Sequence, residues 1–223
     1  MTSVYGQIYE EIYSSTELIE FVATIFNDER QRHPVVYDIG CGYGRLIGEL
    51  LKRTPNVFGI DTDEACREAC SRRYPNVDFR EAIPESWPAP NLVFFNFHVL
   101  NYLSPPEFKS YLNKFAANGM KCGHIYTDFI DRGKLMIGSF QRKKNVNQQY
   151  IFENSLSFHG GSGAVFSEKI YENSELVYTK TSNLHLWTLE EVIKTFYSSD
   201  LNVRSNQMLS TKNAITTAIR VEV

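Results

Sequence analysis

Short apolar runs alternate with helical patterns along the first part of the chain. The runs are rich in β-branched and aromatic residues, which is typical of strands buried on both faces of a parallel sheet. Between the runs, apolar residues recur three and four positions apart, the spacing of one helix face. This alternation predicts an α/β fold with a mostly parallel sheet. The predicted strands are residues 35–39, 57–61, 77–79, 91–97 and 122–131.

Residues 132–187 interrupt this alternation. A parallel crossover requires little more than one helix, yet roughly seventy residues separate Asp131 from the next convincing strand. Glycine-rich and polar turns divide the segment into strand-like stretches, which predicts an inserted antiparallel flap of three strands, at residues 149–158, 164–171 and 176–186. The basic residues of the segment are interpreted as a solvated loop: Arg132, Lys134, Arg142, Lys143 and Lys144. A capped helix and two strands complete the chain, at 188–196, 201–208 and 214–223.

The N-terminal segment has the pattern of a surface helix with aromatic residues on its apolar stripe. The residues of that stripe are Tyr5, Ile8, Tyr9, Ile12 and Tyr13. Residues 18–26 are predicted to form a second helix, entered through a serine or threonine that caps its first turn. From the residues alone, the aromatic stripe is interpreted as a cover for one edge of the sheet.

Composition narrows the functional classes. The chain has 223 residues, of which 43% are hydrophobic, so it can bury a full core and is predicted to be one domain. A net charge of −3 gives no reason to expect nucleic acid. No long apolar span or signal peptide is visible, so we expect a cytoplasmic protein without a membrane partner. The four cysteines form no C-x-x-C pair and have no matching histidine group, so no metal site is expected.

The chemistry concentrates in the loop after the first predicted strand. Three glycines at alternate positions, Gly40, Gly42 and Gly44, lie between that strand and a predicted helix. Such a corner binds nucleotides because glycine lets a ligand approach the backbone, and the helix N-terminus offers unpaired N–H groups. A dinucleotide fingerprint needs a small residue where this chain has Arg45, which disfavours a nicotinamide-dependent oxidoreductase. Asp61 follows about twenty residues downstream, where a carboxylate can accept both hydroxyls of a ribose.

Residues 38–44, DIGCGYG, together with Asp61, resemble motif I and the ribose-binding acid of class I S-adenosylmethionine-dependent methyltransferases. The resemblance implies a Rossmann-like sheet of seven strands, mostly parallel, with an antiparallel last strand. The flap, followed by W-T-x-E-E and a helix, is similar to the small-molecule branch of the family, including amino-sugar N-methyltransferases. The chain departs from the family at residues 119–121, which replace the common turn before the fifth strand, and at Asn91, which replaces the usual acid before the fourth.

The same resemblance implies S-adenosylmethionine as the cofactor and assigns residues to it. Asp61 would bind the ribose, Glu81 and Ala82 would lie near the adenine, and the N-terminal segment, residues 1–30, would serve as a lid. The implied cofactor-binding residues are Tyr9, Asp38, Gly40, Cys41, Gly42, Gly44, Arg45, Asp61, Thr62, Glu81, Ala82, Asn96 and Phe97.

The end of the fourth predicted strand is the first place to look for the methyl acceptor, because open parallel sheets bind ligands at the carboxyl ends of their strands. Residues 96–99 lack the D/N-P-P-Y/F tetrapeptide of methyltransferases that act on nucleobases or protein amides. This favours a small metabolite such as a sugar, amine or carboxylate. His98 is the candidate general base, since an imidazole titrates near neutral pH; the alternative is a histidine that fixes a loop. The predicted substrate-binding residues are Tyr13, Asn101, Tyr102, Tyr126, Asp128 and His185.

Three functions stay open on this reading. The leading one transfers a methyl group from S-adenosylmethionine to a nitrogen or oxygen of a small metabolite. The alternatives are an NAD-dependent oxidoreductase and a non-catalytic scaffold that binds S-adenosylmethionine. We expect a monomer or a homodimer in which the flap, residues 132–187, covers the substrate site.

Overall fold

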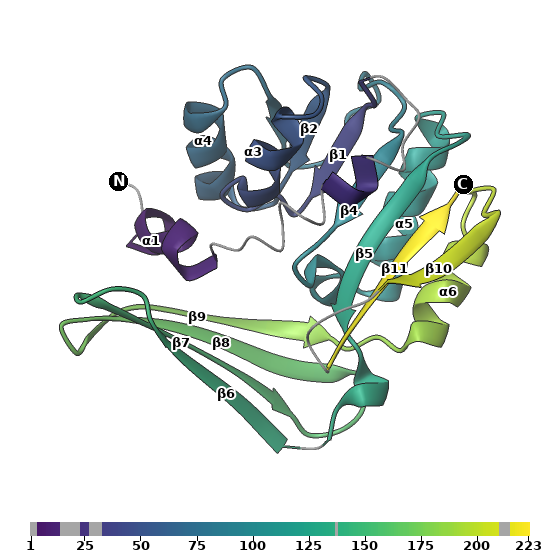
Figure 1. Cartoon of the computed structure of the whole chain (residues 1–223). Helices are drawn as coiled ribbons and strands as arrows, with labels where there is room; N and C mark the ends of the chain where they lie inside the picture. Colours follow the sequence, from purple (N-terminus) through teal and green to yellow (C-terminus); the bar gives the residue numbers. More distant parts are fainter. Residues whose placement is uncertain (1–3, 14–22, 27–32, 137, 210–214) are drawn as a thin grey trace.

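A computed structural model describes residues 4–13, 23–26, 33–136, 138–209 and 215–223. In this part of the chain, the strands form two separate sheets, one of seven strands and one of four (Figure 1). Helices lie on both faces of the large sheet. The predicted α/β class with an inserted antiparallel sheet is confirmed. A second helix is predicted at residues 18–26; residues 23–26 are helical, and residues 18–22 lie outside the described residues.

The large sheet has the strand order β10-β11-β5-β4-β1-β2-β3. Its strands are β1 Val36–Ile39, β2 Val57–Ile60, β3 Asp78–Arg80, β4 Leu92–Phe95, β5 His124–Ile130, β10 Ser205–Leu209 and β11 Thr216–Glu222. Strands β1 to β5 are parallel, whereas β11 runs antiparallel between β5 and β10. The predicted seven-stranded sheet with an antiparallel last strand is therefore confirmed. Strands β2 and β3 follow on one side of β1, whereas β4 and β5 lie on its other side, so the strand order switches between β1 and β4. Open α/β sheets bind ligands at such a switch point.

Two core layers attach the helices to this sheet. On one face lie α3 Arg45–Leu51 and α4 Glu64–Arg73, and on the other α5 Pro105–Ala117 and α6 Leu189–Tyr197 (Figure 1). Leu46 of α3 packs in one layer, and Phe108 of α5 and Phe196 of α6 pack in the other. Thr188 and Glu191 form the predicted capping box at the start of α6. Short 3-10 helices follow β4 and β5: η1 Val99–Tyr102 and η2 Arg132–Lys134.

The small sheet lies against the carboxyl end of the large one. Its strands, each antiparallel to the next, are β6 Gly138–Asn145, β7 Tyr150–Phe158, β8 Gly163–Glu172 and β9 Glu175–His185. The sequence predicts three of them and is wrong about β6, which it interprets as a solvated loop. β6 is an exposed edge strand, and lysine and arginine are frequent at edges because their charge discourages pairing with another chain. An edge strand of this kind lacks the apolar alternation by which strands are recognised.

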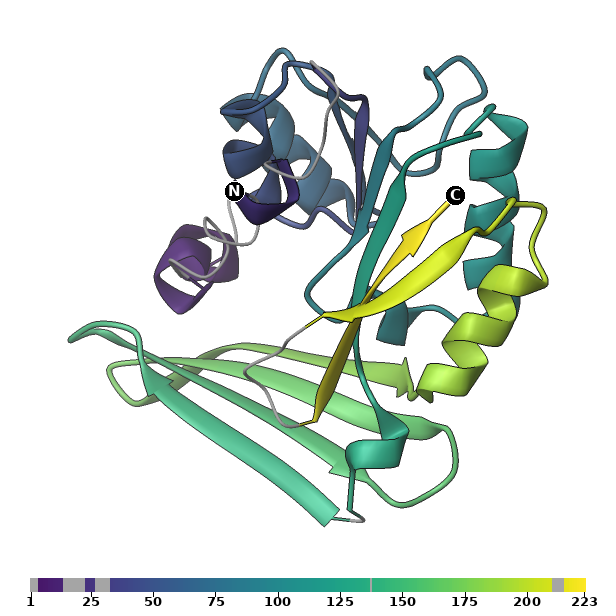
Figure 2. The same cartoon turned by 45° about the vertical axis from the view of Figure 1, so that its right-hand side comes forward.

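The N-terminal helix, α1 Val4–Tyr13, lies over the small sheet in both views (Figures 1 and 2). Ile8 and Ile12 pack against Phe152 of β7 and Ile170 of β8. The Lys144 Nζ atom of β6 donates a hydrogen bond to the Ile12 carbonyl oxygen at 2.8 Å. Ile8 and Ile12, the described isoleucines of the predicted stripe, therefore pack on the small sheet.

Candidate functional site

The loop between β1 and α3 depends on glycine. Gly40, Gly42 and Gly44 have φ values of +67°, +52° and +80°, a region that other residues rarely adopt. The Gly40 N–H group donates to the Ile60 carbonyl oxygen at 2.7 Å, which fixes the loop to the end of β2. A Cβ atom at Gly40 would lie 2.6 Å from Cγ2 of Val99, so a side chain does not fit there.

Asp61 is joined directly to this loop. Its Oδ2 atom accepts the Gly42 N–H group at 2.7 Å, and its Oδ1 atom accepts the Asp63 N–H group at 2.9 Å. Burial raises the pKa of Asp61, while these two backbone hydrogen bonds oppose the rise. A carboxylate offers about four acceptor positions, so Asp61 can also receive hydroxyl groups of a ligand. The structure thus brings together the two motifs that the sequence singles out.

Asp38, near the end of β1, is a buried acid at the base of the same loop. Only 4% of its surface is exposed, and its Oδ2 atom has no hydrogen-bond partner among the described residues. Burial, followed by the charge of Asp61, raises the pKa of Asp38 well above its ordinary range. A buried acceptor without a partner costs stability, which points to a ligand that supplies the donor. Asp38 therefore fits a ligand with a cationic N–H group.

The chain turns sharply after β4, which ends at Phe95, two residues earlier than predicted. Phe97 and His98 have φ values of +61° and +63°, an uncommon conformation for residues with side chains. The His98 N–H group donates to Oδ1 of Asp128 on β5 at 2.7 Å, and burial raises the pKa of that carboxyl. The Arg45 guanidinium lies 3.9 Å from the centre of the Phe97 ring. Such strain, combined with charged groups, is typical of functional sites.

The His98 ring has a partner on the far side of the turn. Its Nε2 atom lies 3.1 Å from Oγ1 of Thr216 at the start of β11. Asn96, beside it, is buried with 7% of its surface exposed. His98 thus lies at the carboxyl edge of the sheet. Its contact with Thr216 also helps to fix the turn after β4.

The remaining residues predicted to bind the cofactor occupy two kinds of position. Thr62, Glu81 and Ala82 are exposed beyond the ends of β2 and β3. Cys41 is a buried residue of the loop itself, and a hydrogen bond with Cys70, followed by burial, raises the pKa of its thiol. The side chain of Tyr9, and that of Tyr13 from the substrate-binding set, are outside the described part of α1.

Three residues predicted to bind substrate are turned into the protein. Asn101 has no exposed surface; its amide donates to the carbonyl oxygens of Ile130 and His185 at 3.2 and 2.8 Å. It therefore links β5 to β9, and a buried amide with these partners leaves no surface for a substrate. Tyr126 is 2% exposed and stacks on a core phenylalanine. The His185 ring packs against Trp187 at 4.8 Å, and burial lowers the pKa of His185.

Tyr102 faces a group that the sequence analysis does not single out. Burial, followed by the charge of Glu168 on β8, raises the pKa of Tyr102 to about 12. Glu168 is 5% exposed, and Oε1 of its carboxylate accepts the Tyr5 hydroxyl at 3.0 Å. The Tyr5 ring contacts Tyr178 of β9 and Tyr43 of the glycine loop, with centroid distances of 5.0 and 5.9 Å. We call Tyr5, Tyr43, Tyr102 and Tyr178 the tyrosine cluster.

A signal for Glu168 was present in the sequence. Alternate residues of a strand share one face, and the buried face of β8 carries Ala164, Glu168 and Ile170. An acid among apolar residues on a buried face is an exception that predicts a partner or a ligand.

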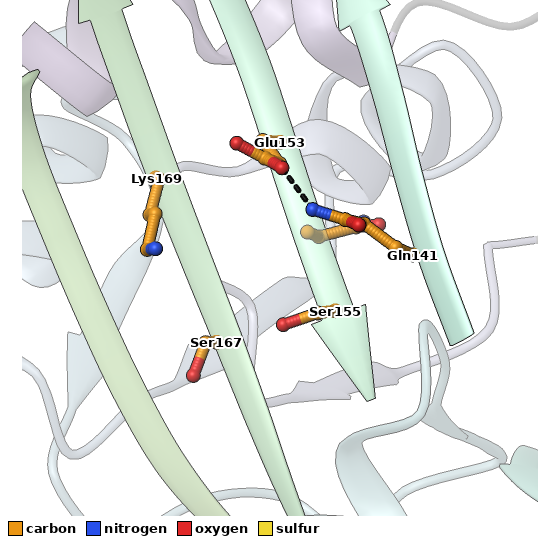
Figure 3. A pocket seen from close by; sticks show the side chains of 6 residues that line it. Gln141, Glu153, Ser155, Ser167 and Lys169 are labelled. Atoms are coloured by element: carbon orange, nitrogen blue, oxygen red, sulfur yellow. Dashed lines mark hydrogen bonds between the residues drawn. The ribbon is translucent and has the colours of Figure 1, made fainter. Parts of the chain in front are cut away.

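The opposite face of the small sheet carries a shallow polar hollow (Figure 3). Gln141, Glu153, Ser155, Ser167 and Lys169 line it, and Gln141 donates a hydrogen bond to Glu153. Among the described residues, no group of three or more histidine, cysteine or acidic side chains is arranged to hold a metal ion. In the same part of the chain, no helix is long and apolar enough to cross a membrane.

Comparison with known families and curated sequences gives one match. Residues 36–118 match the family described as "Methyltransferase domain". No curated protein sequence matches the chain.

Solved structures share the fold over nearly the whole chain. CalS10, an amino pentose methyltransferase from Micromonospora echinaspora determined with S-adenosylmethionine, is 15% identical with a TM-score of 0.79, over 100% of this chain and 97% of its own. Streptomyces venezuelae DesVI is 13% identical with a TM-score of 0.78, over 97% of each chain. The sugar N-methyltransferase KedS8 from Streptoalloteichus sp. is 13% identical with a TM-score of 0.76, over 100% and 93%. At these identities the likeness establishes the fold.

Proposed function

We propose that this chain, a class I methyltransferase by its fold and by its domain at residues 36–118, transfers a methyl group from S-adenosylmethionine to a nitrogen or oxygen of a small metabolite. The observation that carries the proposal is the hydrogen bond between the Gly42 N–H group and Asp61, at 2.7 Å. It joins Asp61, the acid that we propose binds the ribose, to the glycine loop.

The residues around the loop fit this donor. Asp61 would receive the ribose hydroxyls, and the buried Asp38 would face the cationic amino group. The exposed Thr62, Glu81 and Ala82 would border the adenine, and Asn96 and Phe97, which follow β4, would border the donor from the end of that strand. When bound, S-adenosylmethionine supplies a methyl group on a positively charged sulfur.

The chemistry is an in-line displacement. A lone pair of the acceptor forms the new bond to the methyl carbon while the carbon–sulfur bond breaks, and the released electron pair stays on sulfur as a neutral thioether. Alignment of the two reactants can contribute about 7–11 kcal/mol of barrier reduction. A proton of the acceptor must also leave, to water or to a protein base. His98 is our candidate for that base, because it stands at the carboxyl end of β4.

Replacing His98 tests this role. If His98 is the base, His98→Ala should lower turnover by about 10²- to 10⁴-fold and leave donor affinity unchanged. Thr216→Val is the matched control, because it removes the partner of the ring and keeps the imidazole. Equal losses of turnover and melting temperature in both variants would assign His98 to fixing the turn.

Donor binding is the first experiment for the proposed function. Isothermal calorimetry with S-adenosylmethionine and S-adenosylhomocysteine should give micromolar affinity, about −8 kcal/mol, with no binding of NADH. Preference for NADH would favour the oxidoreductase alternative. Donor binding without release of S-adenosylhomocysteine across an acceptor screen would favour the non-catalytic scaffold.

The acceptor screen begins with sugars that carry amino groups, followed by other amines and carboxylates. Sugar methyltransferases among the solved structures share the fold over the whole chain, small sheet included, which supports this order. We place the acceptor between the donor loop and the small sheet, under α1. The four cysteines form no disulfide bond, which supports a cytoplasmic location. We expect the enzyme to work as a monomer or homodimer.

A further inference from the structure

The turn after β4 contains two neighbouring residues in a conformation that side chains disfavour. Phe97 and His98 have φ values of +61° and +63°, and the ψ of His98 is 20°. Neither residue is a glycine, so each conformation costs free energy that the surrounding structure must offset. The turn therefore depends on an interaction from outside it.

Asp128 on β5 supplies this interaction. β5 is the parallel neighbour of β4, and the pairing of the two strands ends at Phe95, so Asp128 lies beside the turn. The Oδ1 atom of Asp128 accepts the His98 N–H group at 2.7 Å. Burial raises the pKa of this carboxyl, while the charges of His98 and Arg45 and hydrogen bonds from the His98 and Phe97 N–H groups oppose the rise. Successive N–H groups of a turn form a concave site for an anion, and the carboxylate occupies it.

The two side chains of the turn contact different elements of the candidate site. The Phe97 ring lies 3.9 Å from the guanidinium of Arg45, the first residue of α3 after the glycine loop. The Nε2 atom of His98 lies 3.1 Å from Oγ1 of Thr216 on β11. β4 and β11 flank β5 in the sheet (Figure 2). The backbone of this one turn thus determines where both rings lie.

We propose that Asp128 is a positioning residue, whose carboxylate holds Phe97 and His98 in the turn and thereby fixes the imidazole relative to the donor loop. This inference rests on the proposed function, in which His98 is the base. It gives Asp128 a role other than the substrate contact that the sequence predicts. A catalytic group must be held to within about 0.5 Å of its productive place, and Asp128 provides that restraint through the backbone.

The test compares three variants of the full chain. Asp128→Ala removes the acceptor, and Asp128→Asn keeps one oxygen without the charge. Asp131→Asn is the matched control, because Asp131 follows the same strand and its Oδ1 atom also accepts a backbone N–H group, that of Gly133 at 2.9 Å. Amide hydrogen exchange of Phe97 and His98 is measured by NMR on the donor-free protein. Turnover is measured with the first active acceptor of the screen.

We expect the Phe97 and His98 amides to exchange at least about 10-fold faster in Asp128→Ala than in the wild type, because a hydrogen bond to a charged group is lost. Asp128→Asn should lie between the two, and it also serves if Asp128→Ala does not fold. Asp131→Asn should leave the exchange of these two amides unchanged.

Turnover distinguishes positioning from a general loss of stability. Asp128→Ala should lower kcat by up to about 100-fold, the effect of a small misplacement, with a much smaller change in the KM of the acceptor. In the His98→Ala background, Asp128→Ala should cause no further loss, because a positioning residue acts through the group that it positions.

Three results would overturn the inference: unchanged exchange at Phe97 and His98 in Asp128→Ala, an equal acceleration in Asp131→Asn, or additive losses of turnover in the double variant. Failure of the proposed function would look different. In that case S-adenosylhomocysteine would not bind or no acceptor would be methylated, while the exchange of the two amides would still show whether Asp128 holds the turn.

Discussion

The two halves of the candidate site are built on different principles. In the donor half, the residues are close in the sequence, and Gly42 and Asp61 are 19 positions apart. In the acceptor half, Tyr5 and Glu168 are 163 positions apart and meet only through the packing of α1 on the small sheet. The family match stops at residue 118, before the small sheet begins. The donor half is thus a local motif, whereas the acceptor half is a product of tertiary structure.

The halves also differ in what they would offer a ligand. The donor loop offers backbone groups, held by glycines at positive φ, and two acids at strand ends. The inner face of the small sheet offers side chains on regular strands, which can be exchanged without changing the backbone. Substitutions should therefore damage the donor half through conformation and the acceptor half through specificity. Three further predictions examine this difference, from the largest expected effect to the smallest.

The largest effect is expected at Asp61. Asp61→Ala removes the acceptor for the ribose and leaves the Gly42 and Asp63 N–H groups without it. Two hydrogen bonds to a charged group contribute about 3–6 kcal/mol, so affinity for S-adenosylhomocysteine should fall by at least about 100-fold in calorimetry. Circular dichroism should show the fold retained.

Asp61→Asn is the matched control for this loss. It keeps one acceptor oxygen for Gly42, so its donor affinity should lie between those of the wild type and Asp61→Ala. If Asp61→Ala bound S-adenosylhomocysteine as tightly as the wild type, Asp61 would not be the acid that receives the ribose.

The fold was predictable where local patterns determine it. Buried parallel strands are continuous apolar runs, and residues 38–44 identify the loop between β1 and α3. The positions of the first five strands along the chain therefore follow from the sequence. β6 was not predictable, because an exposed edge strand needs no apolar alternation. The partners of Asn101 were not predictable, since its place after β4 says nothing about the carbonyl groups that it meets. Glu168 was missed although it alternates with Ala164, Phe166 and Ile170, which marks it as an acid on an apolar strand face.

The second prediction compares one glycine from each half. Gly40→Ala combines a φ of +67° with a Cβ atom 2.6 Å from Val99. The left-handed conformation costs about 1–2 kcal/mol for a non-glycine residue, and the overlap adds to it. We expect a loss of about 2–4 kcal/mol, which lowers the melting temperature of a chain this size by roughly 5–15 °C. Donor affinity should fall with it.

Gly161→Ala, in the turn between β7 and β8, is the control in the other half. Its φ is +74°, but nothing lies within 4 Å of the added Cβ atom. It should cost only the conformational part, about 1–2 kcal/mol, and leave donor affinity unchanged. Equal thermal shifts for the two variants would show that the overlap with Val99 is relieved at no cost.

The smallest effect is a pH dependence at Asp38. Burial raises the folded-state pKa of this acid, so the native protein holds the proton more tightly than the unfolded chain. The stability that this provides is complete below the ordinary pKa, about 3.9, and is lost as pH rises through the raised value. Asp38→Asn removes the titration. The variant should gain stability relative to the wild type between pH 4 and neutrality, by a few degrees in melting temperature.

The same substitution should weaken the donor, because an amide cannot replace a carboxylate opposite a cationic amino group. Stability and binding would then move in opposite directions at one residue, as expected of an acid kept for its ligand. Asp61 and Asp128 also have raised pKa values, so the informative quantity is the difference between wild type and variant. A difference in melting temperature that stays constant from pH 4 to 8 would show that Asp38 is not the group that titrates. It would then remain a structural acid, and the donor half would rest on Asp61 and the glycine loop.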